Sequence, residues 1–348
     1  MMHLKALREM VKEWDMTNPD ERPSAASKFQ SILDRLEWFG EIEWSEYTPA
    51  HNPEYSTSYM TRLAGWIGNV KRAEDCKLLL EYSLQLSFFS HEDLFALYQA
   101  AFSGPITRWI IEQEGLSLFD SEFQTRLSDE LHKRTWYCPV TESMNISDFC
   151  HINQISGISY QPRFRNLKKF GHAGLKCFIQ APNPTNSAPP LKRLVLLEDF
   201  VGSGTQVSGP ITWAASKLDI PILFVPLVIC APGARQLEKI GKKFVSKLHV
   251  SPLITLAERD LLGPKRNGVD GMANADQIER LARDTFEQVA GGLHTNKNTP
   301  PHTAFGYRQT GSSFVTYSNT SNNTLPLIHH KPKTGSWQPL FPRSARVQ

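Results

Sequence analysis

Two adjacent carboxylates, Glu198 and Asp199, stand at the end of an apolar run, and a loop of small residues follows them. The loop contains Gly202, Ser203, Gly204, Thr205 and Gln206. Backbone N–H groups of such a loop, at the start of a helix, form an anion site whose usual guest is phosphate. An acid pair alone is often a solvated strand end, and a Gly-Ser-Gly sequence alone is often a turn. Together and in this order, they predict a binding site for a phosphorylated ligand.

The elements around this stretch favour an α/β sheet. The four residues 194–197 are all apolar, which is typical of a strand buried on both faces in a parallel sheet. The acid pair then stands at the carboxyl end of that strand, where open α/β sheets bind their ligands. Residues 207–218 have a helical pattern and would carry the loop at their amino end.

This arrangement resembles the signature of the type I phosphoribosyltransferases, in which a hydrophobic strand precedes two acidic residues, two apolar residues and a small-residue loop. The resemblance implies that Glu198 and Asp199 are catalytic, hold the ribose hydroxyls of phosphoribosyl pyrophosphate and bind Mg²⁺ directly or through water. It also implies that residues 202–206 grip the 5′-phosphate. Gly202 departs from the pattern because several members carry an acidic residue there that acts on the nucleobase. Gln206 replaces the usual Thr or Ser, which leaves phosphate binding by the backbone intact.

Strands and helices are predicted to alternate on both sides of this stretch. Further strands are expected at 135–140, 175–180, 222–225 and 247–254, and helices at 146–155 and 231–243. Pro226 should end or bulge its strand because proline donates no hydrogen bond to a ladder. The alternation predicts an α/β fold with a parallel five-stranded, phosphoribosyltransferase-like sheet flanked by helices.

Candidates for pyrophosphate binding are less specific. Glu142 and Ser143 occupy the loop after the first core strand, where the resemblance places pyrophosphate, although an ordinary strand-to-helix turn would have the same composition. Arg163 and Arg165 lie in the most basic short run near the core. They would either bind pyrophosphate or form a solvated charged face. The Pro- and Asn-rich residues 181–191 correspond to a flexible flap in the resembling family.

The first third of the chain is helical in pattern and carries no catalytic constellation. Helices are expected near 4–14, 24–39, 58–70, 73–86, 91–101 and 104–114. We therefore expect a helical docking or regulatory domain over residues 1–130 and a phosphoribosyltransferase-like domain with a C-terminal extension over residues 131–348.

Composition narrows the class of protein. The chain of 348 residues has a formal net charge of +3, which is too small to argue for nucleic-acid binding. It has no apolar run long enough to cross a bilayer and no apolar segment after Met1 of the kind that a signal peptide has. Its five cysteines are scattered without metal-binding spacing. These features predict a cytoplasmic protein without a membrane partner.

Two motifs near the end of the sequence, taken together with the acid pair and its loop, give a closer resemblance. Residues 198–204 read Glu-Asp-Phe-Val-Gly-Ser-Gly, residues 323–326 read Asn-Thr-Leu-Pro, and residues 337–341 read Trp-Gln-Pro-Leu-Phe. Over residues 135–348 the chain is similar to the phosphoribosyltransferase-like effectors of bacterial conflict systems, including retron-type antiphage modules. The resemblance implies a toxin effector restrained by protein partners from the same defence operon, an ATPase or a reverse transcriptase with its nucleic acid.

The tail offers further candidates. Asn322 and Asn323 could reach the pocket, because asparagine both donates and accepts, or they could form a turn before a short strand. Trp337 and Phe341 are expected to form a C-terminal clamp against the core or a partner.

Two classes of function follow. One is a phosphoribosyltransferase- or glycosyltransferase-like enzyme acting on a nucleotide such as phosphoribosyl pyrophosphate, NAD or ATP, by ribosyl transfer or hydrolysis. The other is a non-catalytic module that senses a nucleotide and regulates a partner.

Overall fold

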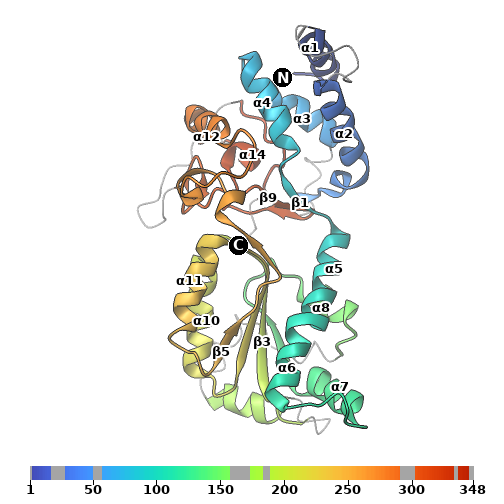
Figure 1. The fold of residues 1–348 in the computed structure, drawn as a ribbon, viewed down its shortest axis with the longest axis vertical. Coiled ribbons are helices and arrows are strands. Elements are labelled where there is room, and N and C mark those ends of the chain that lie inside the picture. The colour runs from blue at the N-terminus through green and yellow to red at the C-terminus, as the bar shows by residue number, and fades with distance from the viewer. Residues whose placement is uncertain are drawn as a thin grey trace. The chain divides into compact units, whose positions relative to one another are not determined.

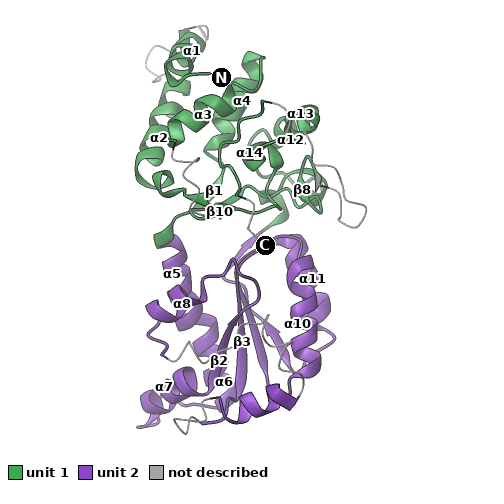
Figure 2. Cartoon of the chain, turned by 180° about the vertical axis from the view of Figure 1, so that it is seen from behind, with its two compact units in different colours: residues 1–92, 257–348 green, residues 93–256 purple. Residues whose placement is uncertain are grey.

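The computed structural model describes residues 2–16, 28–49, 57–156, 173–182, 189–290, 302–332 and 336–344. The chain divides into two compact units (Figure 2). Unit 1 comprises residues 1–92 and 257–348, and unit 2 comprises residues 93–256. Unit 1 thus combines both ends of the chain, whereas unit 2 is one continuous segment. The domain boundary predicted at residue 130 falls inside unit 2.

A parallel sheet forms the centre of unit 2. Its strands are β2 (Thr135–Pro139), β3 (Arg193–Val201), β4 (Ile222–Cys230), β5 (Leu248–Val250) and β6 (Ile254–Leu256). The order is β2-β3-β4-β5, and β6 also pairs with β4. All of these pairings are parallel. The predicted parallel five-stranded sheet is therefore confirmed.

Pro226 lies within β4 and does not end it. The pairing of β3 with β4 keeps one register from Leu194↔Ile222 to Val201↔Ile229, so the predicted end or bulge at Pro226 is wrong. The carbonyl of Pro226 accepts a hydrogen bond from the backbone N–H of Leu253 at 3.2 Å, in the break between β5 and β6. Because N–H and C=O of one strand residue point to the same side, the donor that proline lacks faces this break rather than β3.

Helices cover both faces of the sheet. Figure 1 shows α10 (Thr205–Lys217) and α11 (Ala231–Gly241) on one side of it. On the other side lie α5 (His91–Ala101), α6 (Thr107–Glu114) and α8 (Ile146–Ile152). The π-helical turn η4 (Phe102–Ile106) connects α5 to α6, and α7 (Phe123–Lys133) precedes β2.

The strand predicted at 175–180 is wrong, because residues 173–180 form a helix. Leu175, Phe178 and Ile179 are spaced as one face of a helix, but a short apolar run of this kind does not distinguish a helix from a strand. In the fold this face packs on the sheet. Leu175 is buried, and the Phe178 ring meets the Trp136 ring of β2 edge to face, with centroids 4.8 Å apart.

Unit 1 combines helices from both ends of the chain. Its first part contains α1 (Leu4–Met16), α2 (Lys28–Ile42), η1 (Trp44–Glu46), α3 (Tyr59–Ile67), α4 (Ala73–Ser83) and β1 (Ser87–Phe89). Its second part contains η6 (Glu258–Asp260), η7 (Gly263–Arg266), α12 (Ala275–Asp284), α13 (Phe286–Ala290), β7 (His302–Thr303), β8 (Gly306–Tyr307), β9 (Phe314–Thr316), β10 (Asn319–Thr320) and α14 (Pro326–His329). Strand β1 pairs with β9, so the two parts share one small sheet. Among the described residues, no helix is both long and apolar enough to span a membrane.

The C-terminal clamp is present and closes on unit 1 itself. Phe341 is 0 % exposed, and its ring lies 5.0–6.0 Å from the ring centroids of four aromatic residues: Trp44, Tyr47, Tyr59 and Phe88. The indole N–H groups of Trp337 and Trp66 both donate to the carbonyl of Leu327, at 3.0 and 2.7 Å. Trp337 and Phe341 are thus part of the core that the first helices form.

Candidate functional site

The acid pair lies at the carboxyl end of β3, as the sequence predicts. β2 ends at Pro139, which pairs with Leu197, so Glu198 has no partner in β2. The chain after β2 turns over this end of the sheet instead. Glu198 is only 2 % exposed, whereas Asp199 is partly exposed. The two adjacent carboxylates therefore lie in different surroundings.

Hydroxyl groups of the loop after β2 bind both carboxylates. The backbone N–H of Thr141 donates to Glu198 Oε2 at 2.9 Å, and its hydroxyl donates to Oε1 at 2.6 Å. The hydroxyl of Ser143 lies 3.4 Å from Glu198 Oε1 and 2.9 Å from Asp199 Oδ1. Asp199 Oδ1 also accepts the backbone N–H of Phe200 at 2.8 Å. The loop and the acid pair thus form one hydrogen-bonded cluster.

The 202–206 loop leads directly into α10. Gly204 precedes the first residue of the helix with φ of +78°, a left-handed conformation that favours glycine. The first N–H groups of any α-helix have no acceptor within the helix, and the helix dipole is positive at this end. Thr205 and Gln206 are exposed, so this end of α10 is open to solvent. Its chemistry suits a phosphate.

The amino end of α11 packs against the same loop. A Cβ atom on Gly233 would lie 2.6 Å from the carbonyl oxygen of Gly202, closer than real Cβ contacts. A Cβ on Gly204 would lie 3.1 Å from the Cβ of Gln236. Gly233 therefore permits a close approach that fixes the loop. The sequence prediction did not include Gly233 in the site; the signal was a glycine beside Pro232 in the first turn of a helix.

The predicted pyrophosphate residues have different outcomes. Ser143 binds the acid pair through its hydroxyl, and Glu142 is exposed on the same loop. Arg163 and Arg165 lie outside the described residues. Thr141 was missed because its role depends on the pairing of β2 with β3, which brings residues 57 positions apart into contact.

Asn322 and Asn323 belong to unit 1, while the acid pair belongs to unit 2. The side-chain oxygen of Asn323 accepts the hydroxyl of Thr310 at 2.8 Å, and its amide donates to the Asn322 side-chain oxygen at 3.1 Å. These contacts fit a turn held by its own side chains. A contact of either asparagine with the ligand stays a prediction.

The donor set at the acid pair fits Mg²⁺ bound in part by a substrate. Mg²⁺ prefers oxygen ligands, keeps several waters and is usually held by one or two carboxylates together with substrate phosphates. Asp199 is partly exposed and carries such oxygens. Within the described residues there is no group of three or more His, Cys, Asp or Glu that could hold a metal by itself. Any metal here would depend on the ligand for the rest of its coordination.

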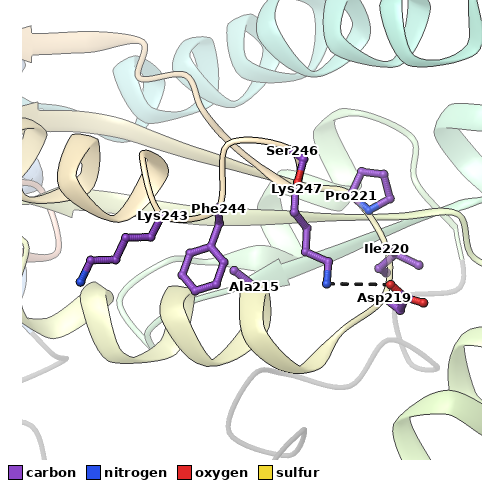
Figure 3. A pocket seen from close by; sticks show the side chains of 8 residues that line it. All are labelled: Ala215, Asp219, Ile220, Pro221, Lys243, Phe244, Ser246 and Lys247. Atoms are coloured by element: carbon purple, nitrogen blue, oxygen red, sulfur yellow. Dashed lines mark ion pairs between the residues drawn. The ribbon is translucent and has the colours of Figure 1, made fainter.

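A cavity lies away from this site, at the amino ends of β4 and β5. It has a volume of about 500 Å³ and is lined by residues around the start of β4 and β5, including Lys243, Phe244 and Lys247 (Figure 3). Lys247 pairs weakly with Asp219, at 4.0 Å. Helices α10 and α11 end here, at Lys217 and Gly241. Because helix carboxyl ends carry partial negative charge, cationic side chains such as these lysines are favourable there.

Comparison with known proteins agrees with this architecture. A family model described as PRTase-CE matches residues 63–343. The match extends beyond the resemblance over residues 135–348 and includes part of α3, in agreement with a unit 1 built from both ends of the chain. No curated protein and no solved structure matches the chain. Because the family model covers most of the sequence, the chain belongs to the PRTase-CE family, a phosphoribosyltransferase-like effector family.

Proposed function

We propose that the protein binds a ribose 5-phosphate group, carried by a nucleotide such as phosphoribosyl pyrophosphate, NAD or ATP, at the carboxyl end of β3. The observation that carries this proposal is the placement of the acid pair beside the 202–206 loop and the open amino end of α10. The helix end and the loop suit the 5′-phosphate, and the partly exposed Asp199 suits the ribose diol. Membership of the family supports a ribose-phosphate substrate.

The proposed activity is transfer of a ribosyl or phosphoribosyl group, or hydrolysis of a nucleotide. Asp199 would supply negative charge near the ribose carbon, where an oxocarbenium-like transition state develops positive charge. Mg²⁺, when bound, would stabilise the departing pyrophosphate. The backbone N–H groups at the start of α10 would fix the position of the phosphate and hence of the ribose. In the cell such an enzyme would act as a toxin effector of a bacterial antiphage system, restrained by protein partners from the same operon.

Expression of the protein without its partners tests this activity. We expect the wild-type protein to arrest growth and the variant Asp199→Ala to be harmless at equal protein level. Mass spectrometry of nucleotide pools and nucleic acids after induction would identify the product. Equal toxicity of the two proteins would refute the catalytic role of Asp199.

A nucleotide sensor is the second candidate, and Gly202 favours it. At this position a side chain that could act as acid or base on a nucleobase is absent. Gripping the phosphate needs only the backbone, so binding without turnover remains compatible with the loop. Calorimetric titration with phosphoribosyl pyrophosphate, ATP and NAD, combined with a product assay, separates the two candidates. Binding without product supports the sensor, whereas turnover supports the enzyme.

A further inference from the structure

The two carboxylates of the acid pair differ in how deeply they are buried. Glu198 is buried, and both of its carboxylate oxygens accept hydrogen bonds from the loop after β2. A buried carboxylate is stable only when such donors surround it. The backbone N–H and hydroxyl of Thr141 supply the two shortest of these bonds. A ribose hydroxyl that approached Glu198 would compete with Thr141 for these oxygens.

Asp199 has a different position. Its side chain is partly exposed, and the hydrogen bonds from Ser143 and the Phe200 backbone both end on Oδ1. These bonds help to orient the carboxylate, and the partial exposure of the side chain keeps it within reach of solvent. Glu198 is therefore bound within the protein, whereas Asp199 is accessible to a ligand.

We propose that Glu198 is an anchor for the loop after β2, and that Asp199 alone of the pair binds the ligand. Thr141 and Ser143 are then positioning residues. The Thr141 hydroxyl donates to Glu198 and accepts the backbone N–H of Ser143 at 3.3 Å, and the Ser143 hydroxyl donates to Asp199. A continuous chain of hydrogen bonds therefore runs from Glu198 to Asp199. Because hydrogen bonds in such chains strengthen one another, loss of the Thr141 hydroxyl loosens Asp199 as well. This inference rests on the proposed function only where it names the ligand.

The first test compares ligand binding by the acid pair. Titration calorimetry with phosphoribosyl pyrophosphate and MgCl₂ would measure Kd for wild type, Glu198→Gln and Asp199→Asn. We expect Asp199→Asn to weaken binding by about a hundredfold or more, because its charge contacts the ligand. Glu198→Gln should weaken binding by about tenfold or less. Equal losses in the two variants, with unchanged stability of Glu198→Gln, would overturn the proposal.

The second test needs no ligand. In thermal unfolding, Glu198→Gln should lower Tm by about 4 °C or more, because a neutral amide replaces the charge-assisted hydrogen bonds of a buried carboxylate that accepts at both oxygens. Asp199→Asn should change Tm far less. Thr141→Val should also be destabilised, and the double variant with Glu198→Gln should lose less stability than the sum of the two single losses. Additive losses in the double variant would contradict the anchor.

Conservative and control variants separate positioning from general structural damage. Thr141→Ser keeps both donors and should restore binding of phosphoribosyl pyrophosphate to within about threefold of wild type, whereas Thr141→Val should not. Thr212→Val removes a hydroxyl from an exposed position of α10 and should leave both stability and binding unchanged. If the wild-type protein binds neither phosphoribosyl pyrophosphate, NAD nor ATP, the proposed function fails, while the unfolding measurements still decide whether Glu198 is an anchor.

Discussion

Substitution of Gly233 tests whether α11 fixes the 202–206 loop. In Gly233→Ala the new Cβ would lie 2.6 Å from the carbonyl oxygen of Gly202 and 3.0 Å from Val201 Cγ1. The oxygen belongs to the backbone, so it cannot rotate away, and the helix or the loop must move. Overpacking of this kind costs about 1–3 kcal/mol, and a contact with backbone belongs near the upper end. Part of this cost is offset, because alanine stabilises a helix by about 1 kcal/mol relative to glycine.

The net result for Gly233→Ala is a loss of about 2 kcal/mol, which corresponds to a Tm lower by about 4–8 °C for a unit of this size. Scanning calorimetry measures this shift, and calorimetric titration with phosphoribosyl pyrophosphate measures the effect of the displaced loop on binding. Gly241→Ala is the matched control, because Gly241 lies at the end of the same helix and a Cβ there would meet nothing within 4 Å. If the Gly233→Ala variant were as stable as this control, the close approach of α11 to the loop would be refuted.

Three further outcomes follow from burial. Phe341→Ala should destabilise unit 1 by about 3–5 kcal/mol, because it empties the centre of an aromatic cluster, and chemical denaturation would measure the loss. Phe119→Ala, at a side chain that is 99 % exposed, should change stability by less than about 0.5 kcal/mol in the same assay. Iodoacetamide at pH 8 should label the exposed Cys177 first. Burial raises the pKa of Cys76 to about 11 and that of Cys150 to about 12, so both of these thiols stay protonated. Peptide mass spectrometry measures the labelling rates, and labelling of either buried thiol as fast as Cys177 would contradict the packing.

The sequence predicts correctly those features that depend only on residues close together in the chain. The uninterrupted apolar residues 194–197 indicated a central parallel strand, and the acid pair and loop after it are placed as expected. The helix at 173–180 was missed because its apolar residues are too few to distinguish the two periodicities. At Pro226 the strand continues because the neighbouring chain is interrupted between β5 and β6, so no donor is needed there.

Contacts between distant parts of the chain were beyond prediction from one sequence. No pattern in residues 1–92 indicates that they share a core with residues 257–348, because the pairing of β1 with β9 depends on the complete fold. The role of Thr141 has the same origin. Its type is common in turns, and only the position of β2 beside β3 brings it to Glu198. Sequence therefore identified the acid pair but not the residues that orient it.

The contacts of the acid pair also bear on the choice between an enzyme and a sensor. Asp199 is joined through Ser143 and Thr141 to Glu198, so a ligand that moves the Asp199 carboxylate also perturbs the loop that leads into α8. A sensor needs such a link from its ligand to the rest of the fold. An enzyme needs instead that the carboxylate stay fixed while charge develops on the ribose carbon, because reorientation during the reaction would reduce its electrostatic stabilisation. If the protein is an enzyme, these hydrogen bonds should persist in the liganded state. If it is a sensor, ligand binding should break them. Their persistence after ligand binding, rather than affinity, therefore separates the two functions.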